Sequence, residues 1–240
     1  MRPLPIYLRD ERHPQAQVCA ACEVRSGALF GALDAEGLER LHADIAAPEL
    51  EPDERLYARG EPGLAMYTIR AGLVRFERTT ERGDRRIVRL AGRGDLIGQE
   101  ALLRHPHAED AVACTRVELC RIPLPVVDGP GAPSALLVEL MRRWQRALDE
   151  SAAWSADLSA GPARRRVLML LSLLARHADD DDVIWLPRRE EMGAMLDMTF
   201  ETASRMVSQL RREGVVEPLP PRQARLDRMR LAAALQAANA

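Results

Sequence analysis

Short β-prone segments separated by glycines fill residues 50–123, and this pattern constrains the fold more than any other feature of the chain. The apolar pieces include MYTIRAG, LVRFERTT, RRIVRLAG and VELCRIP, with a glycine about every ten residues. Short strands at this spacing are typical of a small antiparallel barrel or jelly roll. Within the region, ERGDRR predicts a hairpin turn at Gly83-Asp84.

A long helix is predicted after the glycine- and proline-rich stretch VVDGPGAPS at 126–134, which marks a domain boundary. Apolar side chains there recur at steps of three and four, and the resulting stripe has the width of a coiled-coil seam. We interpret it as a dimer interface; the alternative is a helix that packs against its own domain. The stripe consists of Leu137, Leu140, Met141, Trp144 and Leu148.

Two short helices joined by a tight turn are predicted in LPRREEMGAMLDMTFETASRMVSQLRREGVV, residues 186–216. The first spans 188–196, and the second spans 200–213 with Thr199 as its N-cap and Gly214 at its end. The second helix has a buried face formed by Ala203, Met206, Val207 and Leu210. The pattern indicates a helix-turn-helix, and VVEPLPPRQARLDRM after it predicts a two-stranded wing whose arginines contact phosphate.

The outer face of the second helix carries side chains that suit base edges in the major groove. Glu accepts a hydrogen bond from cytosine, Arg donates two to guanine, and Ser bonds to either. The residues are Glu201, Thr202, Ser204 and Arg205. The alternative is a helical hairpin whose charged face contacts only solvent.

A small barrel, a long helix and a terminal winged helix-turn-helix, in this order, resemble the CRP/FNR superfamily of bacterial transcription regulators over nearly the whole chain. FETASR at 200–205 resembles the recognition helix of the FNR branch, V-E-T-x-S-R, whereas the CRP branch has R-E-T-x-G-R. Two residues depart from the family pattern: Phe200 replaces a smaller Val, and Asp197 replaces the usual turn Gly. Asp tolerates a left-handed conformation better than most residues, so the second change is mild.

The resemblance implies a role for each side chain and a DNA half-site similar to TTGAT. It implies that Glu201, Ser204 and Arg205 read bases, and that Arg189, Thr199 and Thr202 hold phosphates. The expected partners are double-stranded DNA, a second copy of the chain and RNA polymerase. The expected fold class is α+β, with a cysteine-containing segment at 1–30, a barrel of the cyclic-nucleotide-binding type at 31–130, a dimerisation helix at 131–160 and the winged helix-turn-helix at 161–240.

Cyclic AMP is not an expected ligand of the barrel. Superfamily members that bind it have a G-E-[LI]-[GA]-L segment followed by an Arg-Ser pair that holds the cyclic phosphate. Here the corresponding segment is GQEALLRHPHAEDAVA, with Glu100 displaced by one residue and Ala108-Glu109 in place of Arg-Ser. A carboxylate beside an anionic phosphate is repulsive.

The segment CAACEVRSGALF at 19–30 resembles the N-terminus of oxygen-sensing FNR-like proteins, patterned C-x2-C-P-[VI]-R-x-x-A-x-C. The resemblance implies an iron–sulfur cluster and a response to oxygen or redox state. Cys19 and Cys22 match the first two ligands, Phe30 falls on the third, and Cys120 in ELCRIP matches a ligand on a barrel strand. One cluster cysteine is therefore missing.

Cys114 is the candidate replacement for the missing ligand. On an unbroken strand it would lie about 20 Å from Cys120, too far for one cluster unless the strand breaks or folds back between them. Otherwise it is an inert buried thiol. Three alternatives to a cluster stay open: a zinc site or thiol switch, haem bound through His105 or His107, and no cofactor.

Other functional classes find little support in the sequence. There is no Walker or G-x-G-x-x-G loop and no Ser/His/Asp signature, so we do not expect an enzyme. No apolar run approaches the roughly 20 residues that span a bilayer, and no signal peptide opens the chain, so no membrane association is expected. Four cysteines without a secretory signal indicate a reducing compartment, so we expect a cytoplasmic protein.

Overall fold

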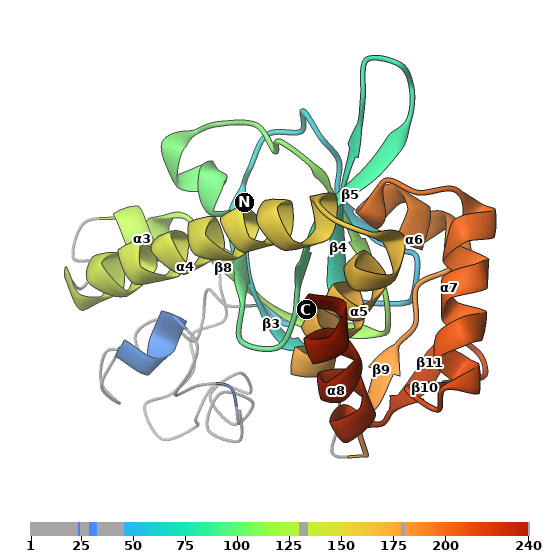
Figure 1. The fold of residues 1–240 in the computed structure, drawn as a ribbon. Coiled ribbons are helices and arrows are strands. Elements are labelled where there is room, and N and C mark those ends of the chain that lie inside the picture. The colour runs from blue at the N-terminus through green and yellow to red at the C-terminus, as the bar shows by residue number, and fades with distance from the viewer. Residues whose placement is uncertain (1–23, 25–28, 33–45, 130–133, 179–180, 240) are drawn as a thin grey trace.

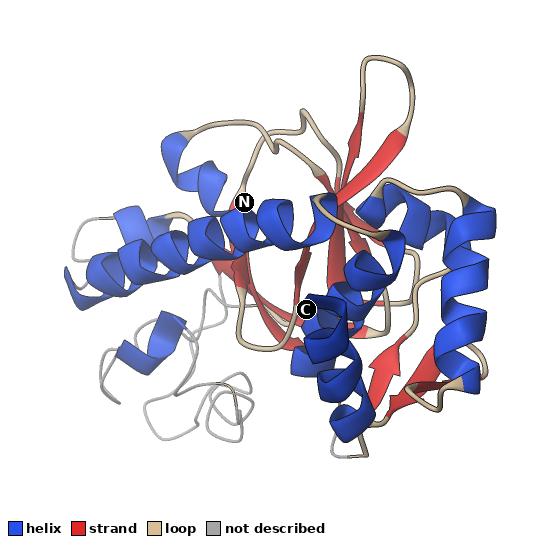
Figure 2. Cartoon of the chain, viewed as in Figure 1, coloured by secondary structure: helices blue, strands red, loops and turns tan. Residues whose placement is uncertain are grey.

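The computed structural model describes residues 24, 29–32, 46–129, 134–178 and 181–239. A β-sandwich occupies the centre, a long helix crosses it, and a smaller helical domain with its own sheet follows (Figures 1 and 2). This is the predicted α+β architecture. Among the helices of these ranges, none is long and apolar enough to cross a membrane.

The sandwich consists of two four-stranded antiparallel sheets, with strand orders β1-β8-β3-β6 and β2-β7-β4-β5. Its strands are β1 (Glu49–Leu50), β2 (Arg55–Tyr57), β3 (Ala65–Ala71), β4 (Val74–Thr79), β5 (Arg85–Ala91), β6 (Leu96–Ile97), β7 (Asp110–Ala113) and β8 (Val117–Pro123). Short 3-10 helices lie at η2 (Leu29–Ala32) and η4 (Gln99–Leu103).

Two glycines shape the tight turns of the sandwich. Gly72, between β3 and β4, has a φ of 89°, and a Cβ there would lie 2.2 Å from the carbonyl oxygen of Arg116, so only glycine fits. Gly83, with a φ of 85°, lies in the β4–β5 hairpin. The hairpin predicted at Gly83-Asp84 is therefore present.

The chain between Cys114 and Cys120 is not one strand. β7 ends at Ala113, β8 begins at Val117, and the two strands belong to different sheets. The Thr115 hydroxyl accepts a hydrogen bond from the backbone N–H of Leu73 at 3.1 Å, which holds the chain where it crosses from one sheet to the other. The unbroken strand considered from the sequence does not exist.

The long helix α4 (Ser134–Ser159) follows the short helix α3 (Pro125–Asp128) and lies across the sandwich (Figure 1). Its buried residues at the N-terminal half, Leu136 and Leu140, pack in one apolar cluster with Met66 and Ile122 of the barrel. Its C-terminal half contributes Trp154 and Leu158 to the core of the next domain. A single helix therefore connects both cores.

The C-terminal domain contains four α-helices among its described residues and a three-stranded sheet of order β10-β11-β9. Its elements are α5 (Ala163–Leu174), the 3-10 helix η5 (Ala175–His177), β9 (Val183–Trp185), α6 (Arg189–Leu196), α7 (Phe200–Arg212), β10 (Val216–Leu219), β11 (Gln223–Leu226) and α8 (Arg228–Asn239). The barrel residues Leu73, Leu90 and Cys114 belong to this domain's apolar cluster, so the core is continuous across the junction.

Candidate DNA interface and sensor sites

The predicted helix-turn-helix is formed by α6, the turn 197–199 and α7. Asp197 adopts the left-handed conformation, with a φ of 52°, as expected for a residue in the place of a turn glycine. A Cβ at Gly193 would lie 2.6 Å from the carbonyl oxygen of Met198, so glycine allows the close approach of α6 to the turn. Helix α7 lies at the edge of the molecule (Figure 1).

Thr199 caps α7 as predicted. Its hydroxyl accepts a hydrogen bond from the backbone N–H of Thr202 at 3.3 Å and lies 3.2 Å from the Thr202 hydroxyl. Ala203, Val207 and Leu210 are buried, whereas Met206 is only partly buried. These contacts fix the rotation of α7 about its axis and therefore determine which residues it presents outward.

The three predicted base-reading residues lie on the outer face of α7. Glu201 and Arg205 are exposed and Ser204 is half-buried. Hydrogen bonds from its own backbone N–H and from the Thr199 hydroxyl lower the pKa of Glu201, which keeps this carboxylate ionised. An ionised carboxylate accepts hydrogen bonds, the chemistry needed to recognise a cytosine amino group.

The predicted phosphate contacts are less uniform. Thr199 is exposed, but its hydroxyl is already bound to the backbone N–H of Thr202 in the helix cap. The Thr202 hydroxyl lies next to the Thr199 hydroxyl. Arg189 is half-buried; its guanidinium donates to the carbonyl oxygen of Pro187 at 3.4 Å, and burial lowers its pKa. To reach a phosphate, Arg189 would have to turn away from its own chain.

The barrel's β4–β5 hairpin lies beside the turn of the helix-turn-helix. Arg86 of β5 donates a hydrogen bond to the carboxylate of Asp197. An open hollow of about 910 Å³ lies between the two parts, lined by Arg85 on the barrel side and by Thr199 and Phe200 on the other. The first turn of α7 therefore faces the barrel as well as solvent.

The predicted dimer stripe on α4 divides into two faces. Leu137, Met141 and Leu148 are 56%, 65% and 59% exposed. Leu140 is 2% exposed and packs on the barrel, and Trp144 is partly buried against the same cluster. We therefore correct the seam: Leu140 and Trp144 face their own chain, because the stripe is wide enough to serve two surfaces.

Of the four cysteines, the structure describes two. Cys120 is buried in the cluster that also contains Leu29, the residue before Phe30. Cys114 is buried in a different cluster, together with residues of the C-terminal domain, and burial raises the pKa of its thiol to about 12 despite the nearby Arg75. Cys19, Cys22 and the side chain of Phe30 lie outside the described residues. Although the strand breaks as a fourth ligand would require, Cys114 and Cys120 lie in different clusters, so Cys114 is corrected to a buried thiol.

The GQEALLRHPHAEDAVA segment makes side-chain contacts within the barrel. His107 is 4% exposed, stacks on Tyr57 with ring centroids 3.6 Å apart, and its Nδ1 lies 2.6 Å from Oε1 of Glu100. Glu109 lies 3.6 Å from the guanidinium of Arg89. The carboxylate predicted to repel a cyclic phosphate thus has an arginine partner, and His107 has a structural role in packing.

Two features were missed from the sequence. The first is helix α8, which packs against α5. Its sequence signal was Asp227 as an N-cap before the helical stretch RMRLAAALQAAN, and the Asp227 carboxylate indeed accepts a hydrogen bond from the backbone N–H of Arg230 at 2.9 Å. The second is a set of ion pairs at the domain junction involving Asp53, Arg75 and Glu191. No local pattern predicts these, because the partners are far apart in sequence.

A barrel, a long connecting helix and a helix-turn-helix at the molecular edge are the arrangement of a DNA-binding transcription regulator. Sequence profiles agree: the family described as cyclic nucleotide-binding domain matches residues 48–128, and that described as Crp-like helix-turn-helix domain matches 165–234. The chain belongs to the CRP/FNR superfamily of transcription regulators.

Similar proteins cover most of the chain. It is 27% identical over 210 residues to the transcriptional regulatory protein btr of Bordetella pertussis, covering 85% of this chain and 87% of that protein. It is 27% identical over 212 residues to the transcriptional activator protein FnrL of Cereibacter sphaeroides, covering 82% of this chain and 83% of that protein. The structure of FixK2 from Bradyrhizobium japonicum matches with a TM-score of 0.69 and 25% identity, covering 79% of this chain and 96% of that one. The family and these relatives are regulators and not enzymes.

Proposed function

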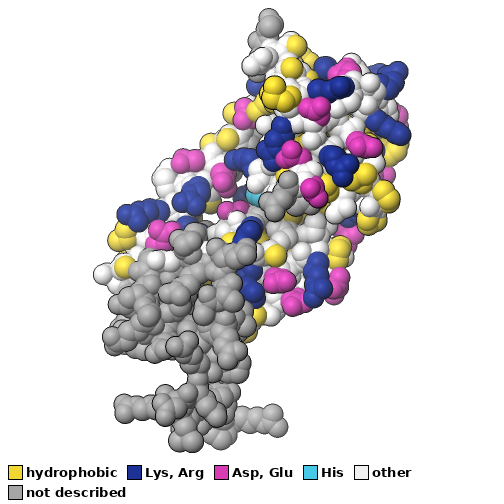
Figure 3. Space-filling model, turned by 90° about the horizontal axis from the view of Figure 1, so that it is seen from below, with side chains coloured by type: hydrophobic (Ala, Val, Ile, Leu, Met, Phe, Trp, Pro, Cys, Tyr) yellow, Lys and Arg dark blue, Asp and Glu magenta, His cyan; other side chains and the backbone are white. Residues whose placement is uncertain are grey.

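We propose that the protein is a homodimeric, sequence-specific regulator that binds a palindromic operator with half-sites similar to TTGAT in the cytoplasm. The observation that carries this proposal is the rotation of α7: its cap and buried face leave Glu201, Ser204 and Arg205 together on the accessible side. These three match the base-reading set of the FNR branch. Basic and acidic side chains are interspersed on the face in Figure 3, and the net charge is −2, so local geometry and not bulk charge would select DNA.

The dimer would form through the exposed face of α4. Leu137, Val138, Met141 and Leu148 are large apolar side chains that are each about half exposed or more. A second copy of α4 would cover them in a coiled-coil-like seam. Two recognition helices would then lie about 34 Å apart, one turn of DNA. RNA polymerase is the expected further partner of the DNA-bound dimer.

The proposed signal is oxygen or redox state, read through an iron–sulfur cluster. Cys19, Cys22 and Cys120 would supply three thiolates, the donors that such clusters require. The position of Leu29 in the same apolar cluster as Cys120 supports this set, because it brings a residue of the N-terminal segment to the Cys120 side of the barrel. The second candidate, a regulator with another ligand or none, is favoured by Phe30 at the third cysteine position.

DNA binding tests the first part of the proposal. Fluorescence anisotropy with a labelled palindrome of TTGAT half-sites should show binding at least about a thousandfold tighter than to a scrambled duplex at the same salt concentration. Equal affinity for the two duplexes would contradict sequence-specific recognition of this operator.

Iron and acid-labile sulfide analysis tests the second part. After anaerobic purification we expect stoichiometric iron and a visible absorption band that bleaches in air. Cys120→Ser should lose the iron, whereas Cys114→Ser should retain it, because Cys114 lies in a different cluster. Absence of iron in the anaerobic wild-type protein would reject the cluster and leave the second candidate.

A further inference from the structure

Two arginines stand at the start of α6, and the structure places them differently. Arg189 is half-buried and donates to the carbonyl oxygen of Pro187. The side chain of Arg188, the N-cap residue, is 57% exposed. The first helix of a helix-turn-helix crosses the DNA backbone, where arginines contact phosphate. Arg188 is therefore the better placed of the two to bind a phosphate.

Asp53 of the barrel is the partner of Arg188 in this structure. Its carboxylate lies 3.2 Å from the Arg188 guanidinium, and among the described residues it is the one carboxylate paired with that arginine. The Asp53 backbone N–H donates to the carbonyl oxygen of Ala113 at 2.9 Å, which holds the turn 51–54 against β7. Partial burial acts to raise the pKa of Asp53, but the hydrogen bond and charge of Arg75 outweigh it and hold that pKa below its usual value. Arg188 thus faces an ionised carboxylate, which has the same sign of charge as a phosphate.

The other two arginines that contact Asp53 have acidic partners besides it. Arg75 pairs with Glu77 at 2.6 Å, and Arg222 pairs with Glu191 at 2.5 Å. Both arginines therefore keep a partner when Asp53 is withdrawn.

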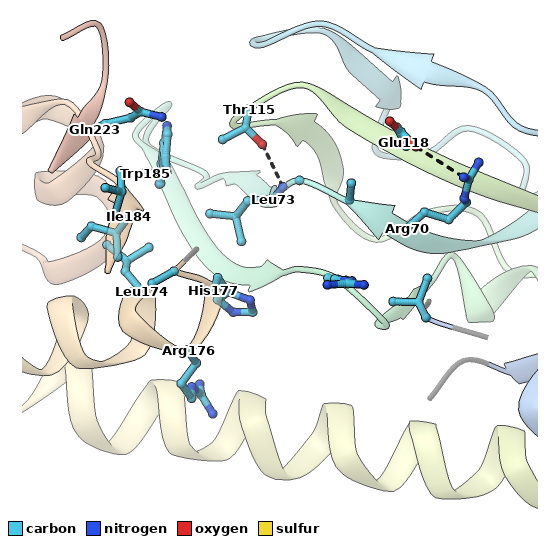
Figure 4. Close-up of a pocket in the computed structure, with 16 residues that line it drawn as sticks. Arg70, Leu73, Thr115, Glu118, Leu174, Arg176, His177, Ile184, Trp185 and Gln223 are labelled. Carbon is cyan, nitrogen blue, oxygen red and sulfur yellow. Dashed lines mark hydrogen bonds and ion pairs between the residues drawn. The ribbon is translucent and has the colours of Figure 1, made fainter. Parts of the chain in front are cut away.

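The wing and the barrel also meet beside these ion pairs. Arg222 lies 5.2 Å from the centroid of the Trp185 ring. Figure 4 shows Trp185 and Gln223, the residue after Arg222, on one side of this junction, with Leu73 and Thr115 of the barrel on the other. The two domains therefore stay in contact through the wing whether or not the exposed ion pair at the α6 N-cap is made.

We propose that Arg188 binds a DNA phosphate and that Asp53 competes with this phosphate for the arginine. The inference rests on the proposed DNA binding. The Asp53 and Arg188 side chains are 39% and 57% exposed, and exposed ion pairs add little stability, so DNA can displace the carboxylate. The Asp53–Arg188 pair and the phosphate contact exclude each other, so the barrel turn lowers the affinity for DNA of any sequence. By reciprocity, bound DNA weakens the pairing of this turn with α6.

Arg188→Gln tests the phosphate contact. Fluorescence anisotropy with the scrambled duplex over a series of salt concentrations should show a log–log salt slope that is smaller by about 0.9, the loss of one phosphate contact. Arg189→Gln, at the neighbouring arginine, should leave the slope unchanged. An unaltered slope in Arg188→Gln would overturn the proposal.

Asp53→Asn tests the competition. Asparagine tolerates the left-handed conformation that Asp53 adopts, with a φ of 68°, so the turn is kept. We expect the affinities for the operator and for the scrambled duplex to rise by the same factor, about threefold to fivefold, the strength of an exposed ion pair. In the Arg188→Gln background the same substitution should give no gain, because the arginine for which the two anions compete is absent.

Asp128→Asn is the matched control. Asp128 pairs with Arg104 at 2.7 Å, and these two side chains are 33% and 66% exposed. Asp128 lies in α3, on the opposite side of the molecule from α6 (Figure 1), so the same change in charge should leave DNA affinity unaltered. Unchanged or lower affinity in Asp53→Asn, or an equal gain with and without Arg188, would contradict the competition. A wild-type protein that binds neither duplex would reject the proposed DNA binding and this inference together.

Discussion

Glu191 of α6 accepts a hydrogen bond from Arg222 of the wing at 2.5 Å, and this pair is the centre of the domain junction. Its other oxygen lies 3.8 Å from Nη1 of Arg75 on β4. Asp53 of the barrel extends the set, 3.0 Å from Arg75 and 3.2 Å from Arg188. Ion pairs therefore join the barrel to the helix-turn-helix. The side chains of Glu191 and Arg75 in this set are only 1% and 5% exposed.

Glu191→Gln should destabilise the protein by about 3 kcal/mol, because it removes the buried one of the carboxylates that Arg75 and Arg222 share. It also weakens the cap of α6, where the Glu191 carboxylate accepts from the Arg188 N–H at 2.6 Å. Urea unfolding measures the change. Glu217→Gln is the control: Glu217 is exposed, 3.9 Å from Arg225, and should change stability by no more than about 0.5 kcal/mol. Similar losses in both variants would contradict a special role of the junction.

Leu137→Glu should dissociate the dimer, costing about 2 kcal/mol or more of association free energy, because it places a charge in the apolar seam. Sedimentation equilibrium measures the dimer, and operator affinity should fall with it. Leu64→Glu is the control, since Leu64 is 72% exposed but lies on the barrel. A dimer that survives Leu137→Glu would place the interface elsewhere.

Arg205→Ala should cost about 1–3 kcal/mol per half-site on the operator and much less on scrambled DNA, because Arg205 is assigned to a base edge. Binding to both duplexes at several salt concentrations measures this ratio. Arg211→Ala, an exposed arginine in the last turn of α7, should leave the ratio unchanged. An unaltered ratio in Arg205→Ala means that another residue reads the base.

Cys114 should make stability fall with rising pH. Its thiol stays protonated in the folded protein to about pH 12, whereas in the unfolded chain it ionises near its usual pKa of 9.0. Between these two values ionisation stabilises only the unfolded chain, so the free energy of unfolding falls as the pH rises. Cys114→Ala should flatten this slope in urea unfolding across that window. In the native protein at neutral pH, Cys114 should also resist iodoacetamide, since the thiolate is the reacting form. Rapid native labelling would show that the thiol is not buried as described.

Local residues were enough to predict the helix-turn-helix. The cap at Thr199, the apolar spacing of Ala203, Val207 and Leu210, and the left-handed turn at Asp197 all act within a few residues, so their geometry follows from neighbours in the chain. The base-reading face follows from them, because burying one side of a helix determines the other.

Tertiary structure alone decided the features that depend on distant partners. It determined that Leu140 faces the barrel while Leu137 stays exposed, and that Cys114 and Cys120 enter different clusters. The junction ion pairs likewise join segments more than a hundred residues apart along the chain, such as Arg75 with Glu191. The spacing of apolar residues in the sequence determines whether a segment forms a helix or a strand. The surface against which that helix or strand packs depends on distant parts of the chain.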